Sequence, residues 1–438
     1  MDDTALSYDE TVEWLFRLQF VGIKMGLDNI RTLAAAWDNP QRRYPVVHIA
    51  GSNGKGSTAC SIASALQAAG YKTGLYTSPH LVDFSERIRI DGVPIPGDAV
   101  IEYARRLRTS IERLHATFFE ATTLMAFTWF AEQQVDVAVI ETGLGGRLDA
   151  TNIVDPVLSV ITSLSIEHRE FLGDTIEEIA AEKGGIIKPG VPVVTSVRTP
   201  GAVAVLEEIA RGKDSTLLQS PDDVRVLQVD DLDRMFCRIP GFDLPVQLSL
   251  IGAHQAENAA LALSALQQLR RRGFVRVDDT AMRRGLRELR ARTGLRGRLE
   301  RLQTTPELVI DVGHNPDGVR ALLTAWNAVR RESETDILLG VLEQKDMQGI
   351  LSHLTHRTFR SITLVEAVSH EARPLEHMLR DAAAAGLQVK TTGNSVDWFR
   401  DKSTRIEQGS TLMFGSHYVL GAFLREWPEK MQNGGLLP

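Results

Sequence analysis

Short aliphatic and β-branched runs alternate with helical patterns over the first 200 residues of the chain. The run from Val46 to Ala50 is typical of a buried strand, and a glycine follows it directly. Further strands are predicted over residues 74–76, 135–140, 157–161 and 191–195, and helices over residues 8–20, 57–69, 99–113, 122–133 and 175–187. Because strands that alternate with helices form parallel sheets, this region predicts a parallel sheet covered on both faces.

The pattern changes near residue 216 and later returns to the alternation of strands and helices. Residues 216–252 carry short alternating strands that predict an antiparallel extension, and helices are predicted over residues 255–272 and 279–290. Strands over residues 308–311, 337–340, 361–365 and 411–414, with helices between them, predict a smaller Rossmann-like α/β domain. A basic, glycine-bearing stretch surrounds Gly294, so we expect one domain over residues 1–294 and a second over residues 295–438.

Composition narrows the class of protein. Of 438 residues, 43% are hydrophobic and 24% are charged, which is ordinary for a globular chain. The net charge of −7 opposes a broad nucleic-acid or anionic-membrane surface. Two cysteines, Cys60 and Cys237, are too few for a disulfide framework. The N-terminus lacks a signal-peptide pattern, and no apolar run approaches the ~20 residues of a membrane span. We therefore expect a cytoplasmic monomer that acts on small molecules.

A glycine-rich loop from Gly51 to Thr58 lies between a predicted strand and a predicted helix. Such a loop directs backbone N–H groups at an anion, and the helix dipole adds positive potential. Its predicted phosphate-binding residues are Gly54, Lys55, Gly56, Ser57 and Thr58. The usual spacing is not met, because Ile49 holds the first glycine position and Gly56 follows the lysine. The alternative is a connecting turn with Lys55 in solvent, but a strand, a loop and a helix in succession favour phosphate binding.

A second glycine-rich segment, from Gly143 to Leu148, also follows a predicted strand. It does not predict a dinucleotide site, because Leu148 stands where the fingerprint needs its last glycine.

About a dozen short motifs in register carry a resemblance to one family. They are GLDN at 26–29, NPQ at 39–41, the phosphate loop, YTSPHL at 76–81, SERI at 85–88, FFE at 118–120, ETGLGGRLDATN at 141–152, EK at 182–183, HQ at 254–255 with Asn258, GR at 297–298, DVGHNP at 311–316 and GS at 415–416. In these motifs the chain resembles the folylpolyglutamate synthase/dihydrofolate synthase family of the Mur ligase superfamily. The resemblance implies a phosphate-loop ATPase domain of the Mur ligase type, followed by a Rossmann-like ligase domain.

Several positions depart from the family pattern. Ser52 stands where Thr is more usual, Glu167 where Asp is, and Leu295 where Trp is common. The segment from Asp311 to His314 reads DVGH where DGAH is usual. Among these changes we expect Glu167 to alter the geometry of the metal site most, because its carboxylate reaches one methylene further.

The resemblance implies two Mg²⁺ ions and leaves room for a monovalent cation. The implied metal ligands are Ser57, Ser78, Glu141 and His168. Hydroxyl and carboxylate oxygens are what Mg²⁺ prefers, whereas a histidine on Mg²⁺ is chemically atypical. A capping or buried neutral histidine is therefore the alternative for His168.

Lys183 lies 15 residues after His168 inside a predicted helix. Composition alone favours a solvated helix lysine, and no acid stands four residues before it, because that position is Ile179. The resemblance instead implies a carbamylated lysine whose new carboxylate orients the metals. Carbamylation requires an unprotonated amine and hence a lowered pKa.

The resemblance also assigns residues of the second half. It places Asn258, Arg298 and Asp311 on ATP, and His314 near phosphate or glutamate in a catalytic role with Lys55 and Lys183. Taken singly, Asn258 would be a polar residue on a helix surface, and Asp311 to His314 a turn at the end of a strand.

A flat pterin requires an aromatic wall and a few polar groups. The resemblance implies that the pocket is lined by Leu27, Asp28, Asn29, Phe118, Phe119, Glu120, Leu148, Asp149 and Ala150. Without the resemblance, the two phenylalanines would equally suit the start of a core helix.

The implied reaction is phosphoryl transfer from ATP to a carboxylate, followed by attack of the L-glutamate amine on the acyl phosphate. The implied acceptors are folates and dihydropteroate. One alternative is another amino-acid ligase of the superfamily, such as a peptidoglycan-precursor ligase; only 50 residues precede Gly51, too few for the extra domain that we expect in those enzymes. The other alternative is a nucleotide-binding module without ligase activity.

Overall fold

The computed structural model describes residues 6–18, 26–367, 369, 371–393, 395–404 and 409–427. The first four residues, which informed the prediction on signal peptides, and Phe20, the predicted end of the first helix, lie outside these ranges. The chain divides into two compact units. Unit 1 comprises Met1–Val224, Ile239–Val246 and Glu257–Leu295, and unit 2 comprises Arg225–Arg238, Gln247–Ala256 and Arg296–Pro438.

Unit 1 is built on an eight-stranded sheet of order β4-β3-β2-β5-β1-β6-β7-β8. The strands are β1 (Val46–Ala50), β2 (Thr73–Tyr76), β3 (Ile88–Ile90), β4 (Val93–Pro94), β5 (Val137–Glu141), β6 (Leu158–Ile161), β7 (Val193–Thr195) and β8 (Leu217–Gln219). From β2 to β8 every pair of neighbours is parallel, whereas β3 and β4 extend one edge as antiparallel strands. Every residue of β1 and β5 is buried, as expected for central strands covered on both faces.

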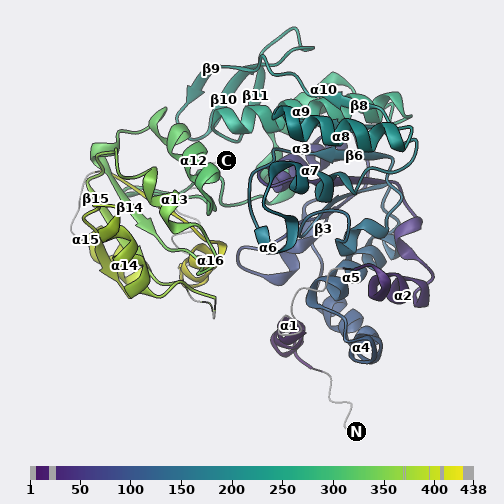
Figure 1. Ribbon diagram of the computed structural model, residues 1–438, viewed down its shortest axis with the longest axis horizontal. Coiled ribbons are helices and arrows are strands. Elements are labelled where there is room, and N and C mark those ends of the chain that lie inside the picture. Colours follow the sequence, from purple (N-terminus) through teal and green to yellow (C-terminus); the bar gives the residue numbers. More distant parts are fainter. Residues whose placement is uncertain are drawn as a thin grey trace. The chain divides into compact units, whose positions relative to one another are not determined.

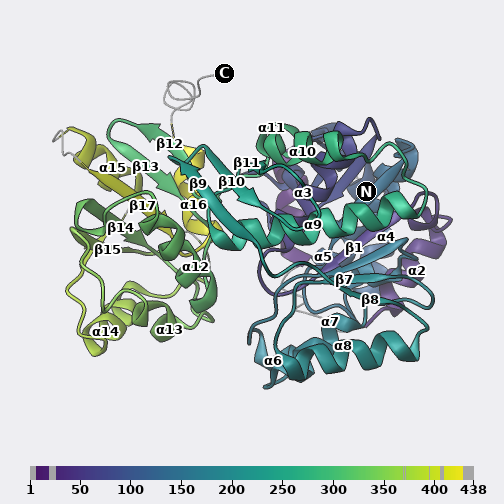
Figure 2. The same ribbon diagram turned by 90° about the horizontal axis from the view of Figure 1, so that it is seen from above.

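Helices cover both faces of this sheet (Figure 1). They are α1 (Tyr8–Arg17), α2 (Asp28–Ala36), α3 (Lys55–Ala68), α4 (Gly97–Leu114), α5 (Phe118–Glu132), α6 (Arg169–Leu172), α7 (Ile176–Gly184), α8 (Pro200–Gly212), α9 (Ala253–Arg271), α10 (Asp279–Arg287) and α11 (Leu289–Thr293), with 3₁₀ turns η2 (Pro40–Arg42), η3 (Phe84–Arg87) and η4 (Ala150–Ile153). Figure 2 shows α7 and α8 on one side of the sheet and α3 and α10 on the other.

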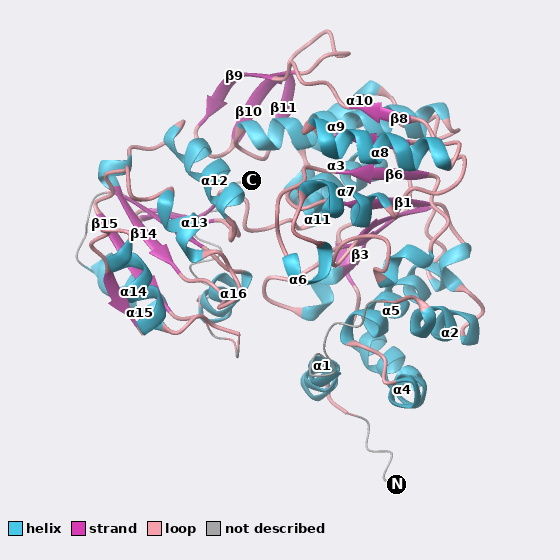
Figure 3. Ribbon diagram, viewed as in Figure 1, coloured by secondary structure: helices cyan, strands magenta, loops and turns pink. Residues whose placement is uncertain are grey.

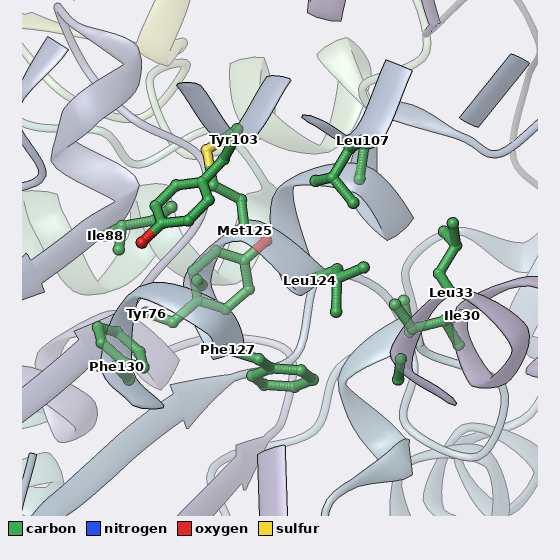
Figure 4. Close-up of a cluster of buried hydrophobic side chains, with 14 of the residues drawn as sticks. Ile30, Leu33, Tyr76, Ile88, Tyr103, Leu107, Leu124, Met125, Phe127 and Phe130 are labelled. Atoms are coloured by element: carbon green, nitrogen blue, oxygen red, sulfur yellow. The ribbon is translucent and has the colours of Figure 1, made fainter. Parts of the chain in front are cut away.

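The helix α5 anchors the main hydrophobic core of unit 1. Its sequence is apolar on nearly every side, which is typical of a helix buried all round. It starts at a capping box in which Thr117 and Glu120 satisfy each other's backbone N–H groups. Figure 4 shows Met125, Phe127 and Phe130 of α5 in one cluster with Tyr76 and side chains of α2 and α4. The cluster fixes α5, and with it Phe118, against the sheet.

Unit 2 contains a six-stranded sheet of order β12-β13-β17-β14-β15-β16. Its strands are β12 (Glu300–Thr304), β13 (Glu307–Ile310), β14 (Thr335–Leu339), β15 (Ser361–Val365), β16 (Lys390–Thr392) and β17 (Ser410–Phe414), and its helices are α12 (Pro316–Asn327), α13 (Met347–Ser352), α14 (Leu375–Ala384), α15 (Ser395–Thr404) and α16 (His417–Glu426), with a 3₁₀ turn η5 (Glu332–Glu334). The five strands β13, β17, β14, β15 and β16 are parallel, and β12 is antiparallel to β13. Figure 3 shows its strands interleaved with helices.

A three-stranded sheet of order β11-β10-β9 is formed by β9 (Arg225–Asp230), β10 (Arg234–Arg238) and β11 (Val246–Leu248). Its hairpin turn carries Asp231, which pairs with Arg301 (2.5 Å) and Arg330 (2.6 Å). Arg330 also forms two hydrogen bonds with the carboxylate of Glu307, so the hairpin is tied to the large sheet of unit 2 by a charged network.

The α/β class with two parallel-rich sheets, predicted from the sequence, is confirmed. One assignment within residues 216–252 is wrong, because β8 pairs parallel to β7 in the large sheet. The reason is α8, an unpredicted helix that makes β7-α8-β8 a crossover unit. The predicted helix over residues 279–290 is interrupted at Glu288 between α10 and α11. No helix of the described ranges is long and apolar enough to cross a membrane.

Candidate functional site

The phosphate loop connects β1 to α3, as the sequence predicts. The helix begins at Lys55, two residues earlier than expected, so Gly56, Ser57 and Thr58 lie in its first turn. The N–H of Thr58 already bonds to the carbonyl of Gly54 (2.9 Å), whereas the first N–H groups of a helix have no partner within it. The loop therefore ends at a helix N-terminus of the kind that suits an anion.

The loop is held by polar residues that follow β6. The N–H of Ser52 donates to the carbonyl of Ser163 (2.8 Å), and the hydroxyl of Ser52 bonds to the backbone of Ser165. The hydroxyl of Thr162 donates to the carbonyl of Asn53 (2.7 Å). Sequence reasoning missed these residues, although a polar run directly after a buried strand was a signal that could have found them.

Asn258 lies directly against the phosphate loop. Gly54 has a φ of +84°, and a Cβ there would lie 2.3 Å from Oδ1 of Asn258. The two residues are 204 positions apart in the sequence, and they meet because α9 places the Asn258 side chain against the loop. The structure thus brings this predicted nucleotide residue to the loop.

Two lysines share one carbonyl oxygen at the base of the loop. Nζ of Lys55 lies 3.0 Å from the oxygen of Gly51, and Nζ of Lys183 lies 2.8 Å from the same oxygen. Lys55 also donates to the carbonyl of Ser52 (3.1 Å). Lys183 is 1% exposed, so the alternative of a solvated helix lysine is wrong.

Lys183 forms an ion pair with Glu167 (3.1 Å). Burial lowers the pKa of Lys183 to about 8, against the opposing effect of the Glu167 charge. Burial by itself raises the pKa of Glu167, but the charges of Lys183 and Lys55 lower it to about 2. This pairing was not foreseen from the sequence, which gave Glu167 only a geometric effect on the metal site.

Two of the four predicted metal ligands, Ser78 and Glu141, are brought together where the neighbouring strands β2 and β5 end. Glu141 ends β5, is buried, and accepts a hydrogen bond from the N–H of Ser78 (3.2 Å). Ser57 is buried in the first turn of α3, and His168 precedes α6 with a φ of +47° and no capping hydrogen bond from its side chain. In the described part of the chain, no three His, Cys, Asp or Glu side chains form a group that could hold a metal by themselves. One buried carboxylate with hydroxyl groups nevertheless fits Mg²⁺, which keeps several waters and phosphate oxygens as ligands.

The proposed pterin residues gather around the start of α5. Phe118 stacks on Phe16 of α1 (ring centroids 5.3 Å apart), and the guanidinium of Arg87 lies 5.0 Å from the centre of the same ring. Phe118, Phe119, Leu27 and Ala150 belong to one hydrophobic cluster. Asp28 is exposed, and Asn29 and Leu148 are half-buried.

Two acidic residues of the predicted pocket are engaged by the protein itself. Glu120 serves the α5 capping box through its Oε2 atom. Asp149 is buried and accepts N–H groups of Gly143, Leu144 and Thr151 at 2.9 Å each, together with the hydroxyl of Thr151. Burial raises the pKa of Asp149, while these hydrogen bonds act in the opposite direction.

Arg298, Asp311 and His314 form a second group within unit 2. Asp311 accepts N–H groups of Leu299 (2.8 Å) and Gly313 (2.7 Å), so it ties the strand after Arg298 to the end of β13. His314 lies 5.7 Å, centroid to centroid, from His417 at the start of α16. Sequence reasoning missed His417, although it directly follows the GS motif at 415–416.

Family models match both halves of the chain. The Mur ligase middle domain matches residues 49–266, and the Mur ligase, glutamate ligase domain matches residues 297–417. The dihydrofolate synthase/folylpolyglutamate synthase of Bacillus subtilis is 37% identical over 361 residues, which is 80% of this chain and 83% of that protein. The folylpolyglutamate synthase of Lacticaseibacillus casei is 35% identical over 82% of this chain and 85% of its own.

Solved structures agree with these sequence relatives. A Mycobacterium tuberculosis folylpolyglutamate synthase complexed with ADP and AMPPCP superposes with a TM-score of 0.83 at 31% identity, over 94% of this chain and 98% of that one. Escherichia coli FolC in complex with DHPP and ADP gives a TM-score of 0.79 at 28% identity, over 96% and 98%.

Proposed function

The chain belongs to the dihydrofolate synthase and folylpolyglutamate synthase family of Mur ligases, and we propose that it is an ATP-dependent ligase that adds L-glutamate to folates. We extend the proposal to dihydropteroate as a second acceptor, because the B. subtilis relative carries both synthase names and the E. coli structure holds DHPP. The two proposed functional domains are residues 1–294 and 295–438.

The observation that carries the proposal is the phosphate loop with Asn258 packed on Gly54. The N-terminus of α3 and the Lys55 ammonium supply positive potential for a triphosphate, and the Asn258 amide offers a donor and an acceptor to a nucleotide. Solved relatives bind ADP and AMPPCP, which supports ATP as the phosphoryl donor here.

The proposed reaction begins with transfer of the terminal phosphoryl group of ATP to a substrate carboxylate, which releases ADP. Lys55 turns from the carbonyl groups of Gly51 and Ser52 to the transferred group and stabilises its charge. The glutamate amine then attacks the acyl phosphate, an amide bond forms, and inorganic phosphate leaves as the amine loses a proton. Positioning and charge neutralisation are the main contributions of the protein.

Ser57, Ser78, Glu141 and His168 are the residues that we propose to hold two Mg²⁺ ions. Bound Mg²⁺ neutralises phosphate charge and polarises the transferred group. The buried carboxylate of Glu141 beside Ser78 supports this assignment more strongly than the half-buried His168 does. We also include a monovalent cation among the proposed cofactors.

We propose that Lys183 is carbamylated in the active enzyme. Its burial and its pKa of about 8 support this, because CO₂ reacts with the unprotonated amine and a pKa near neutrality makes that form accessible. The reaction forms an N–C bond to CO₂ and releases one proton.

Substrate recognition is divided between the two units. The cluster of Phe118, Phe119, Leu27 and Ala150 supports binding of a flat pterin in unit 1. In unit 2, Arg298 and Asp311 are proposed to contact ATP, and His314 is proposed to bind near the phosphate or the incoming glutamate.

The test is ADP release measured separately with tetrahydrofolate and with dihydropteroate, each with and without L-glutamate. We expect continued ADP release to depend on both glutamate and acceptor, because without glutamate the acyl phosphate is not consumed, and we expect this release to be lost in Lys55→Ala. Activity on one acceptor only would contradict bifunctionality. ATP turnover that ignores folates, or an amino acid other than glutamate as the preferred substrate, would contradict the proposed function itself.

A further inference from the structure

A buried chain of hydrogen bonds runs from the central strand β1 to the turn after β5. Nε2 of His48 lies 2.8 Å from the hydroxyl oxygen of Thr151, and that hydroxyl bonds to Oδ1 of Asp149. Oδ2 of Asp149 accepts the N–H groups of Gly143 and Leu144. His48 and Thr151 are fully buried, so the chain lies in the protein interior.

The donor and the acceptor of each hydrogen bond between His48, Thr151 and Asp149 can be assigned from their chemistry. Both oxygens of Asp149 already accept backbone N–H groups, which is the arrangement of a carboxylate acceptor, so the single proton of the Thr151 hydroxyl points at Asp149. The remaining lone pairs of that hydroxyl can only accept, and Nε2–H of His48 must therefore be the donor. Nδ1 of His48 is then unprotonated, and it has no hydrogen-bond partner among the described residues. Burial, with the charge of Lys188, lowers the pKa of His48 to about 3, which keeps the ring neutral.

The far end of the chain borders the proposed substrate pocket. The turn at Gly143 directly follows Thr142 and the metal candidate Glu141. A Cβ on Gly143 would lie 2.5 Å from the Phe119 ring, so the backbone of the turn and that ring are in close contact. Gly143 is exposed, whereas His48, Thr151 and Asp149 of the hydrogen-bond chain are buried. A shift of this turn would therefore change the orientation of the Phe119 ring at the pocket.

We infer that His48 is a positioning residue for the folate pocket, which it orders through Thr151 and Asp149 by fixing the Gly143–Leu144 turn against Phe119. The inference rests on the proposed function, because the pocket belongs to it. His48 acts at a distance, since its fully buried side chain on β1 is connected to the turn through the hydrogen bonds of Thr151 and Asp149.

Amide hydrogen exchange tests the hydrogen-bond chain without any reference to activity. His48→Leu and Thr151→Val each remove one link, and we expect the amides of Gly143 and Leu144 to exchange about tenfold faster, the effect of losing roughly one hydrogen bond. The amide of Val139 in β5 serves as an internal control and keeps its protection. Equal acceleration of all three amides would indicate global destabilisation and overturn the inference.

Kinetics test the link to the substrate. In both variants we expect KM for dihydropteroate to rise about tenfold while KM for ATP stays within about twofold. His48→Gln carries an amide N–H near the position of Nε2 and should restore most of the affinity. The shorter His48→Asn is the matched control, because its amide falls short of Thr151, and it should behave like His48→Leu.

The double variant His48→Leu/Thr151→Val completes the test. Because both residues act through one chain, its KM for dihydropteroate should be no higher than that of the worse single variant. Parallel rises in both KM values, or failure of His48→Gln to differ from His48→Asn, would overturn the inference. A wild type without folate-dependent ADP release would overturn the proposed function, and the exchange pattern of Gly143 and Leu144 would still decide the hydrogen-bond chain.

Discussion

Gly54→Ala is the sharpest test of the nucleotide site, because two separate effects act at this position. The φ of +84° places any other residue in the left-handed region. The added methyl group would also lie 2.3 Å from Oδ1 of Asn258, closer than real Cβ contacts allow. The side chain proposed to contact ATP therefore has to move away from the loop.

The costs in stability of the positive φ and of the contact with Asn258 can be considered separately. A left-handed conformation costs a non-glycine residue about 1–2 kcal/mol. The close contact adds a smaller cost, because Oδ1 is the end of a flexible side chain that can rotate away from the loop. Gly190 has a φ of +68°, and a methyl group added there would meet nothing within 4 Å, so Gly190→Ala bears the backbone cost alone. We expect Gly54→Ala to lose slightly more stability than Gly190→Ala, and the displacement of Asn258 to appear mainly in the KM for ATP.

Urea unfolding and ATP kinetics measure the two consequences. Gly54→Ala should raise KM for ATP at least tenfold, which corresponds to about 1.4 kcal/mol, while Gly190→Ala leaves it unchanged. In an Asn258→Ala background the extra stability loss from Gly54→Ala should shrink, because the clashing atom is gone. Equal losses at the two glycines, with an unaltered KM for ATP in both, would refute the placement of Asn258 on the loop.

Three further perturbations address the ion pair, the helix packing and the metal. The pKa of Glu167 falls from 4.5 to about 2 on folding, so its contribution to stability is present above pH 4.5 and is lost as the pH falls toward 2. This loss amounts to about 3 kcal/mol. Because Asp83, Asp231 and Glu288 also have lowered pKa values, Glu167→Gln should make the acid dependence of stability shallower by about 3 kcal/mol without removing it, and an unchanged acid dependence would contradict the ion pair. Gly285→Ala should destabilise the protein by about 1–3 kcal/mol, because its methyl group would lie 2.5 Å from the backbone of α3. Gly212→Ala is the control, because a methyl group at this open helix position meets nothing and should not destabilise the protein. Equal melting temperatures of the two variants would contradict this packing. Removal of divalent cations with EDTA should stop ADP release, and added Mg²⁺ should restore it. Glu141→Gln should raise the Mg²⁺ concentration needed for the half-maximal rate at least tenfold. An unshifted Mg²⁺ dependence would exclude this carboxylate as a ligand.

The phosphate loop illustrates what local sequence can predict. A β-branched run, four residues that include two glycines, and a helix follow one another within about 20 positions, and each step depends on neighbours in the chain. The prediction therefore needed no knowledge of tertiary contacts. The same holds for the alternation that gives two parallel-rich sheets.

Long-range contacts explain what sequence reasoning missed. The β7-α8-β8 unit was misassigned because the three-residue strand β8 has too little pattern to identify its partner. The support of the phosphate loop by Thr162, Ser163 and Ser165 joins residues more than 100 positions apart. Asp149 was expected to contact substrate, but pattern alone could not show that the protein already supplies four donors to its carboxylate.

Glu167 connects the departure noted in the sequence with the charge balance of the site. The sequence suggested that its extra methylene alters the metal geometry, and the structure shows its carboxylate reaching the ammonium of Lys183. A buried cation without a partner is strongly destabilising, so Glu167 supplies the negative charge that Lys183 needs while it is a protonated ammonium group. The proposed carbamylation would replace that cation with an anion and leave two carboxylates side by side, which is unfavourable without cations between or beside them. We therefore propose that a carbamate on Lys183 and the Mg²⁺ ions are energetically coupled, so that removal of Mg²⁺ favours loss of the carbamate.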